Sequence, residues 1–374
     1  MINTLFLTNL VLGNYILTTH YAEDMMTPYA EAHGGTLIAT VDHLSFYKVS
    51  DENYNKHYNI LESSFDVEKE VEFSIGEAVF IQTPGQMFFE IREQVPWHLD
   101  RISKEDLPLD GTFNHPNCLS NPNVTVNTYI VDTGIDVKHP EFEGRATWLN
   151  NFTEDGDDFD GHGHGTHCAG LVGSLTYGVC KDANLFAVKV LDAEGSGSMS
   201  GVLGGLDFIF KRHKAQDENV RSIVSMSLGG GYSKALNRAI ETMLKTSDTF
   251  YVVAAAGNED ADACGTSPAS AKGVITIMAS DITDGRAYFS NYGKCADIYS
   301  PGVNIVSTMP GESTARMSGT SMATPIFAGV VNHYLSKSPE LVNSKIKKAI
   351  LRDATAGTIS GNPENTNNLF VYLE

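Results

Sequence analysis

The sequence predicts an α/β fold in which helices flank a parallel sheet, preceded by a small α+β unit. In the larger, later part of the chain, short apolar runs alternate with helical stretches, and each run stops at small or polar residues. The earlier part instead shows short strand-like runs around two helical stretches. The pattern loosens between the two parts, and the Pro84-Gly85 turn signal there predicts an exposed linker over Thr83 to Glu93.

The N-terminal part begins with a short apolar stretch, Met1 to Gly13. We expect a signal peptide over residues 1–13, although the stretch lacks a basic region; the alternative is a first strand of the unit that follows. Apolar and aromatic residues then alternate between strand-like and helical spacing. The predicted strands are Tyr15 to Thr19, Thr36 to Thr40, Leu44 to Val49 and Val71 to Ile75, and the predicted helices are Tyr21 to Ala32 and Asn53 to Ser64.

The later part contains apolar runs typical of buried parallel strands. In an open α/β sheet, ligands bind at the carboxyl ends of the strands, so the loops that follow these runs are expected to form the site. The runs are Val126 to Val131, Leu185 to Leu191, Ile223 to Leu228 and Phe250 to Ala256.

Composition excludes several function classes. The chain has 374 residues, of which 42% are hydrophobic and 19% charged, so it can bury a sizeable core. A formal net charge of −20 argues against a nucleic-acid partner, which would need a basic patch. No apolar stretch approaches the length of a membrane span. We expect a monomer.

Cysteines and sequons are consistent with an exported protein. An odd number of five cysteines predicts two disulfides and one free thiol, but spacing alone does not reveal the pairing. Asn123-Val-Thr and Asn151-Phe-Thr match the N-glycosylation sequon.

Three segments carry residue types suited to nucleophilic catalysis. Asp132 follows an apolar strand, His164 lies in a glycine- and histidine-rich stretch, and Ser321 precedes a helical run. A serine nucleophile needs a base within hydrogen-bond reach and a third group that orients the base. His164 suits the base and Asp132 the orienting carboxylate. Ser321 at the start of a helix gains a backbone N–H for a developing oxyanion.

Other chemistries fit the same residues less well. His162, His164 and His167 have spacing that could hold zinc, but no further ligand set completes such a site, and one histidine is needed as the base. We expect His162 to be solvated and His167 to be packed. An inert binding protein related to an enzyme would usually lack one of the catalytic residues. A serine peptidase with an acidic base would not have His164.

The three segments resemble the signatures of the subtilisin-like serine proteases, peptidase S8. They read Val131-Asp-Thr-Gly, His164-Gly-Thr-His-Cys-Ala-Gly and Gly319-Thr-Ser-Met-Ala-Thr-Pro, and the Asp, His, Ser order is that of subtilisin. Further likeness from Val95 to Pro339 points to the proteinase K group. The resemblance implies a subtilisin-like catalytic domain over residues 90–374. It also implies an inhibitor-like pro-domain over 14–89, cut off in cis between Thr83 and Glu93.

The resemblance also assigns the substrate site. Asn258 matches the family's side-chain oxyanion donor. One wall segment of the S1 pocket matches Ser227, Leu228 and Gly229, and the other matches Ala255, Ala256 and Gly257. The edge that pairs with extended substrate matches Gly195, Ser196 and Gly197. These wall segments carry no acidic residue, so we expect broad cleavage of proteins and peptides after apolar or aromatic residues.

Metal, disulfide and location expectations follow from the same resemblance. No cofactor is expected for catalysis, but Asp297 and the carbonyls of Lys272 and Val274 match a structural calcium site of the proteinase K group. Cys168 matches an unpaired thiol. The protein is expected to be secreted or, alternatively, kept in a vacuole-like lumen. The implied disulfides are Cys264–Cys295 and Cys118–Cys180.

Overall fold

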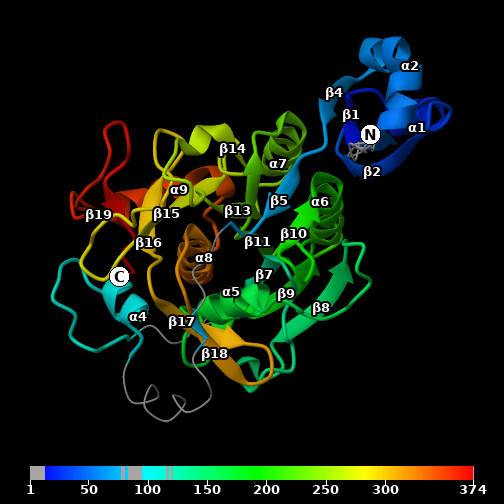
Figure 1. The fold of residues 1–374 in the computed structure, drawn as a ribbon. Helices are drawn as coiled ribbons and strands as arrows, with labels where there is room; N and C mark the ends of the chain where they lie inside the picture. Colours follow the sequence, from blue (N-terminus) through cyan, green and yellow to red (C-terminus); the bar gives the residue numbers. More distant parts are fainter. Residues whose placement is uncertain (1–12, 77–80, 83–94, 115–117, 119–120, 374) are drawn as a thin grey trace, which may run out of the picture. The chain divides into compact units, whose positions relative to one another are not determined.

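The computed structural model of the chain describes residues 13–76, 81–82, 95–114, 118 and 121–373. It divides into two compact units, Met1–Glu70 and Val71–Glu374 (Figure 1). The linker expected at Thr83 to Glu93 and nearly all of the expected signal peptide lie outside the described residues.

The first unit is a four-stranded antiparallel sheet, in the order β2-β3-β1-β4, with two helices. Leu17, Tyr47 and Val49 of the sheet pack with Tyr54 and Leu61 of α2 into a small core. The α+β character predicted for this region is therefore confirmed. Its elements are β1 (Asn14–Thr19), α1 (Glu23–Glu31), β2 (Gly35–Val41), β3 (Leu44–Ser50), α2 (Asp51–Ser64) and β4 (Asp66–Lys69).

A nine-stranded sheet forms the centre of the second unit, in the order β19-β20-β16-β15-β13-β11-β7-β9-β8. Pairing is parallel from β8 through to β20, whereas β19 pairs antiparallel with β20. The predicted parallel α/β sheet is confirmed. Its strands are β7 (Thr125–Asp132), β8 (Ala146–Asn151), β9 (Asn184–Lys189), β11 (Val220–Met226), β13 (Phe250–Ala255), β15 (Ile275–Ser280), β16 (Ile298–Pro301), β19 (Thr355–Ala356) and β20 (Leu369–Phe370).

Two helix pairs pack on this sheet: α5 contacts α8, and α6 contacts α7. Figure 1 shows α5 and α8 close together in the middle of the unit. All residues of α5 and most of α8 are buried, as expected for helices that are apolar all round. The helices are α4 (Trp97–Ile102), α5 (His164–Gly173), α6 (Met199–Lys214), α7 (Lys234–Thr246), α8 (Thr320–Lys337) and α9 (Asn343–Asp353), with short 3₁₀ turns η2 (Pro140–Phe142) and η3 (Ala263–Gly265).

Two small sheets lie beside the large one, and the first contains the strand expected at Val71 to Ile75. That strand forms as β5 (Glu72–Ser74), but it belongs to the second unit instead of the first. One sheet has the order β10-β5-β12-β14 and the other β17-β18-β6. Their remaining strands are β6 (Ile81–Gln82), β10 (Ser196–Ser198), β12 (Gly229–Gly231), β14 (Thr266–Ser267), β17 (Ile305–Met309) and β18 (Ser313–Met317).

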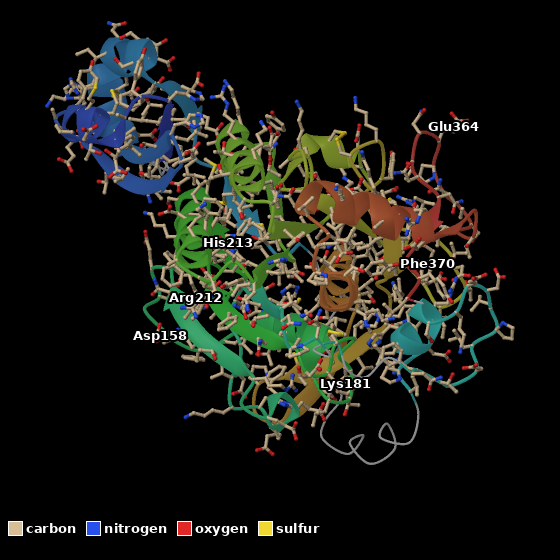
Figure 2. All side chains as sticks on the ribbon, turned by 180° about the vertical axis from the view of Figure 1, so that it is seen from behind. Asp158, Lys181, Arg212, His213, Glu364 and Phe370 are labelled. Carbon is tan, nitrogen blue, oxygen red and sulfur yellow. A yellow bond between two sulfur atoms is a disulfide. The ribbon has the colours of Figure 1, made fainter. Side chains whose placement is uncertain are left out.

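Side chains fill the space between these elements (Figure 2). Phe370 of β20 is fully buried, and the guanidinium carbon of Arg101 lies 4.1 Å from the centre of its ring. Arg101 Nε also donates to Asp284 Oδ1 at 2.7 Å, which fixes α4 to this edge of the sheet. Among the described residues, none of the helices is both long and apolar enough to cross a bilayer.

Candidate active site

Asp132 and His164 meet at the carboxyl end of β7, an interior strand of the large sheet. Asp132 ends the strand, and its Oδ1 lies 2.7 Å from Nδ1 of His164, the first residue of α5. The backbone N–H of Thr133 donates to the same oxygen at 2.8 Å. The other ring nitrogen of His164, Nε2, is buried and has no hydrogen-bond partner within the described ranges. Nε2 is therefore available to accept a proton, although no hydrogen bond joins it to the Ser321 hydroxyl in the described part of the chain.

The environment of His164 stabilises its charged form. Burial by itself would lower the pKa of the imidazole, but the adjacent Asp132 carboxylate outweighs burial and raises the pKa well above its usual value of 6.5. The arrangement therefore stabilises an imidazolium formed when a proton is taken up.

Asp160 holds the start of α5 in place, and the sequence analysis did not identify it. This carboxylate is 4% exposed. Its Oδ1 accepts from Gly163 N–H at 2.7 Å and from Thr133 Oγ1 at 2.7 Å. Its Oδ2 accepts from the N–H of Thr166 at 2.8 Å and from its hydroxyl at 2.6 Å. A carboxylate at a helix N-terminus satisfies otherwise unpaired N–H groups, so Asp160 fixes the helix that carries His164.

The same helix approaches the loop after β7 very closely. A side chain at Gly165 would overlap the carbonyl oxygen of Gly134, so only glycine fits there. Gly163, just before the helix, has a φ of 95°, a left-handed conformation that favours glycine. The glycines of this stretch thus bring His164 against the end of β7.

Ser321 lies in the first turn of α8, with its side chain buried. Its Oγ donates to the carbonyl oxygens of Ser227 at 3.2 Å and Ile75 at 3.3 Å. Ser227 belongs to a wall segment identified in the sequence, whereas Ile75 follows β5 and lies outside every predicted site segment.

Two N–H donors border the space next to Ser321. A Cβ placed on Gly319 would lie 3.5 Å from the backbone nitrogen of Ser321 and 3.6 Å from Nδ2 of Asn258. Asn258 is oriented by Thr320, which donates to its Oδ1 from the backbone N–H at 2.8 Å and from the hydroxyl at 2.9 Å. Its Nδ2 is thereby directed at the space, where it can stabilise a developing oxyanion. Thr320 was not identified from the sequence.

A pocket of about 280 Å³ adjoins Ser321 and Asn258. Both predicted wall segments contribute to its lining, and so do two acidic residues that the sequence analysis had not placed there, Glu72 and Glu259. The described lining residues are Glu72, Ser74, Ile75, Gly76, Leu228, Gly229, Gly230, Gly231, Ala255, Ala256, Gly257, Asn258, Glu259, Thr266, Thr320 and Ser321.

The predicted substrate edge is paired with the chain's own strand β5. This strand runs antiparallel between β10, which contains Ser196 and Gly197, and β12, which begins at Gly229. The pairing continues beyond the strand, since Ile75 N–H donates to the carbonyl of Gly195 at 3.3 Å. Strand addition of this kind is a common way to bind an extended peptide.

Side chains of this segment occupy separate places along the cleft. Phe73 is fully buried, and a Cβ on Gly230 would lie 3.1 Å from its ring. The side chain of Ile75 reaches the other way, because a Cβ on Gly195 would lie 3.0 Å from its Cδ1. Gly76 faces the amide of Asn258: a Cβ there would lie 3.0 Å from Nδ2.

The remaining histidines of the stretch do not form a cluster with close-lying ligand atoms among the described residues. His167 is fully buried, with Nε2 at 3.2 Å from the carbonyl oxygens of Ile305 and Ala315, and burial lowers its pKa to about 3. The packed role predicted for His167 is confirmed. His162 is half-buried, whereas a solvated side chain was expected.

The predicted calcium donors are only partly brought together. Asp297 and Val274 lie at the amino ends of the neighbouring strands β16 and β15, where Asp297 Oδ2 accepts from Thr276 N–H at 2.8 Å. Nζ of Lys347, from α9, lies 2.7 Å from the same Oδ2 and 3.0 Å from the Val274 carbonyl oxygen. Lys272 is exposed. Two of the three oxygen ligands expected for calcium, from Asp297 and Val274, thus accept hydrogen bonds from an ammonium group. The three expected ligands therefore do not fit a calcium ion.

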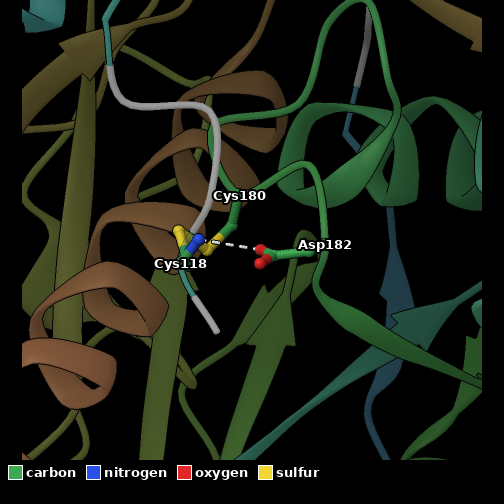
Figure 3. Close-up of side chains that lie close together, drawn as sticks. All are labelled: Cys118, Cys180 and Asp182. Carbon is green, nitrogen blue, oxygen red and sulfur yellow. Dashed lines mark hydrogen bonds between the residues drawn. A yellow bond between two sulfur atoms is a disulfide. The ribbon is translucent and has the colours of Figure 1, made fainter. Parts of the chain in front are cut away.

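Both disulfides implied by the resemblance are present, Cys118–Cys180 and Cys264–Cys295. At the first, the backbone N–H of Cys118 donates to Asp182 Oδ1 at 2.8 Å (Figure 3). Cys168 is a buried free thiol whose Sγ lies 3.8 Å from His164 Nδ1. Burial raises its pKa above the ordinary value, so it stays protonated.

Comparison with known proteins agrees with this geometry. The model of the subtilase family, peptidase S8, matches residues 124–372. The chain is 45% identical over 300 residues to subtilisin-like serine protease Rho m 2.0101 of Rhodotorula mucilaginosa, a match covering 76% of this chain and 87% of that protein. It is 44% identical over 302 residues to alkaline protease 2 of Aspergillus fumigatus, covering 75% of this chain and 61% of that protein.

Two further matches extend the comparison. Cerevisin of Saccharomyces cerevisiae is 41% identical over 303 residues, 76% of this chain and 47% of that protein. The chain thus spans less than two thirds of the Aspergillus and Saccharomyces relatives. The solved structure of a cold adapted subtilisin-like serine proteinase superimposes with a TM-score of 0.68 at 36% identity, over 75% of this chain and 98% of that one.

Proposed function

Because this chain belongs to the subtilase family and is a serine protease, we propose that it is made as a precursor whose own segment Glu72–Gly76 fills the substrate cleft until it is cut. The observation that carries the proposal is the pairing of β5 with both edges of the cleft, which leads the chain past the Ser321 hydroxyl. The unit before Val71 is then an inhibitor-like pro-domain that delivers this segment.

In the proposed reaction, Ser321 Oγ attacks the peptide carbonyl carbon while His164 Nε2 takes the hydroxyl proton. Asp132 holds the imidazole by its Nδ1 and stabilises the imidazolium. Asn258 Nδ2 and the Ser321 N–H bind the oxyanion. The imidazolium then gives its proton to the leaving amine, and water, activated by the same imidazole, hydrolyses the acyl-enzyme.

The side chains in the cleft favour Gly76 as the residue before the processed bond. The side chain of Ile75 lies next to Gly195, while Gly76 faces the oxyanion donor Asn258. A glycine at this position places no side chain in the pocket, although the neighbouring residues Ser74 and Ile75 contribute to the pocket lining. We therefore place self-cleavage at the Gly76–Glu77 bond, earlier than the 83–93 linker expected from the sequence.

Apart from the acidic residues, the pocket walls are built of backbone, small side chains and Leu228, so they suit an apolar or aromatic P1 side chain. Glu259 also lines the pocket, and its Oε2 accepts from Asn291 Nδ2 at 2.6 Å. The carboxylate is exposed at the rim, and a basic P1 residue is therefore a weaker second class of substrate.

Export into an oxidising compartment, outside the cell or in a vacuole-like lumen, is supported by the two disulfides. Asn123 is exposed, as a glycosylated asparagine must be. Asn151 Nδ2 donates to Asp155 Oδ1 and to the Asp157 carbonyl oxygen, both at 3.1 Å, so a glycan on this nitrogen would leave one N–H and replace one of the two hydrogen bonds.

The experiment follows processing of the purified full chain over time by N-terminal sequencing. A full chain that carries Ser321→Ala is followed in parallel as the inactive control. The expected result is a new N-terminus at Glu77 in the parent and an intact Ser321→Ala chain. An N-terminus at Gly76 would shift the register by one residue and contradict the assigned bond. A first cut within 83–93 would contradict the proposal that the segment in the cleft is the one that is cut. Equal processing of both chains would contradict self-cleavage.

A further inference from the structure

The amino ends of β15 and β16 hold a buried carboxylate that needs a positive partner. The Asp297 side chain is 10% exposed. Burial raises its pKa, and the neighbouring Lys347 ammonium and Thr276 N–H oppose this effect. A carboxylate in such a place is retained only where a cation or hydrogen-bond donors compensate for its lost hydration.

Lys347 supplies that partner from a distant part of the chain. Its Nζ lies 2.7 Å from Asp297 Oδ2 and 3.0 Å from the Val274 carbonyl oxygen. Both distances lie within hydrogen-bond range, and the shorter one is that of a charge-assisted bond. The side chain comes from α9, which is anchored on either side of Lys347 by the buried residues Ile346 and Ile350.

From these contacts we propose that the Lys347 ammonium is a built-in substitute for a structural calcium ion at Asp297. Calcium requires six to eight oxygen ligands at about 2.3–2.6 Å. Here the Oδ2 atom and the Val274 carbonyl already accept from the ammonium, and Oδ2 accepts from Thr276 as well. A divalent ion on these oxygens would displace the ammonium and face its positive charge.

With the Lys347 ammonium in place of a calcium ion, the stability of this site no longer depends on a dissolved metal ion. The cation that joins α9 to the ends of β15 and β16 is covalently part of the chain, so chelators do not remove it. The stability contributed by this site is therefore independent of calcium. Any calcium response of the whole protein has to come from other residues, and it does not pass through Asp297.

The test is the shift of the thermal midpoint between 5 mM EDTA and 5 mM CaCl₂, measured on full chains that carry Ser321→Ala to prevent self-digestion. Three further changes are compared in this background. They are Asp297→Asn, Lys347→Met and the nearly isosteric pair Asp297→Asn with Lys347→Met. The matched control is Lys348→Met, which removes the same charge from an exposed position on the same helix.

We expect the calcium shift to be the same in the parent, in Asp297→Asn and in the double variant. In EDTA, Lys347→Met is expected to unfold about 5 °C or more below Lys348→Met, because it leaves the charge of the Asp297 carboxylate buried without a cation. A calcium shift in the parent that disappears in Asp297→Asn or in the double variant would overturn the proposal. So would a Lys347→Met chain as stable in EDTA as the control.

Discussion

Ser321 Oγ lies 3.3 Å from the carbonyl oxygen of Ile75, a residue 246 positions earlier in the chain. This contact joins the proposed nucleophile to the segment that fills the cleft. In the precursor the hydroxyl faces the chain's own backbone, while His164 Nε2 remains without a partner among the described residues. Under the proposed function, inhibition and self-processing would be two consequences of the same occupancy, since the segment that blocks other substrates would itself be held as a substrate.

Phe73 should anchor this segment, because its ring is fully buried between the cleft edges. A synthetic peptide of residues 66–76 is expected to inhibit the processed enzyme, and Phe73→Ala in the peptide should raise its inhibition constant at least about tenfold. Lys69→Gln, a change at an exposed residue of the same peptide that does not line the pocket, is the control and should have little effect. Equal inhibition by the Phe73→Ala and parent peptides would contradict an anchoring role.

Thr320 should contribute to turnover by orienting Asn258. Thr320→Val removes the hydroxyl bond to Asn258 Oδ1 but keeps the backbone one, so kcat is expected to fall about tenfold with KM nearly unchanged. Asn258→Ala should cost about 10²–10³ in kcat, a magnitude taken from the relative subtilisin.

The double variant distinguishes orientation from an independent effect of Thr320. If Thr320 acts through Asn258, adding Thr320→Val to Asn258→Ala should lower kcat little further. Fully multiplied losses in steady-state measurements would instead assign Thr320 a separate contribution.

The pH dependence should reflect the raised pKa of His164. The base must be neutral to accept a proton, so activity is lost as the pH falls through the pKa of the folded enzyme, above the ordinary 6.5. Asp132→Asn removes the carboxylate that raises the pKa; it should shift the acid limb of kcat/KM to lower pH and reduce kcat about 10⁴-fold. Profiles of the parent and variant with one chromogenic peptide substrate check both effects. An acid limb at or below the ordinary pKa of 6.5 in the parent would contradict this prediction.

Asp160 should be important for both stability and rate. Asp160→Asn replaces a buried carboxylate that accepts from several donors around the start of α5. The unfolding free energy is expected to fall by about 2 kcal/mol, with a loss of kcat because His164 begins the same helix. Urea unfolding of inactive chains measures the first effect. The control Asp158→Asn, at an exposed position labelled in Figure 2, should leave both quantities nearly unchanged.

Local patterns predicted the parallel sheet and placed Asp132 at the carboxyl end of a strand. The pairing of Asp132 with His164 was predicted from chemistry, because a serine nucleophile needs a base and a carboxylate that orients it. Local patterns did not predict that β5 pairs with β10 and β12, because the alternation of apolar residues shows that a segment is a strand but not which strands it pairs with. The same limit applies to Asp160, whose role depends on backbone N–H groups from a folded turn. It also applies to Lys347, which has the sequence context of an ordinary surface lysine beside Lys348.

The bond between Lys347 and Asp297 also affects how the molecule responds to dilution. A dissociable ion leaves its site when its free concentration falls below the dissociation constant, and stability falls with it. A cation attached to the backbone keeps a constant local concentration whatever surrounds the molecule. In phosphate- or citrate-rich fluids this part of the protease would therefore remain assembled. Its vulnerability would instead be chemical, because acetylation of the Lys347 amine would remove the charge.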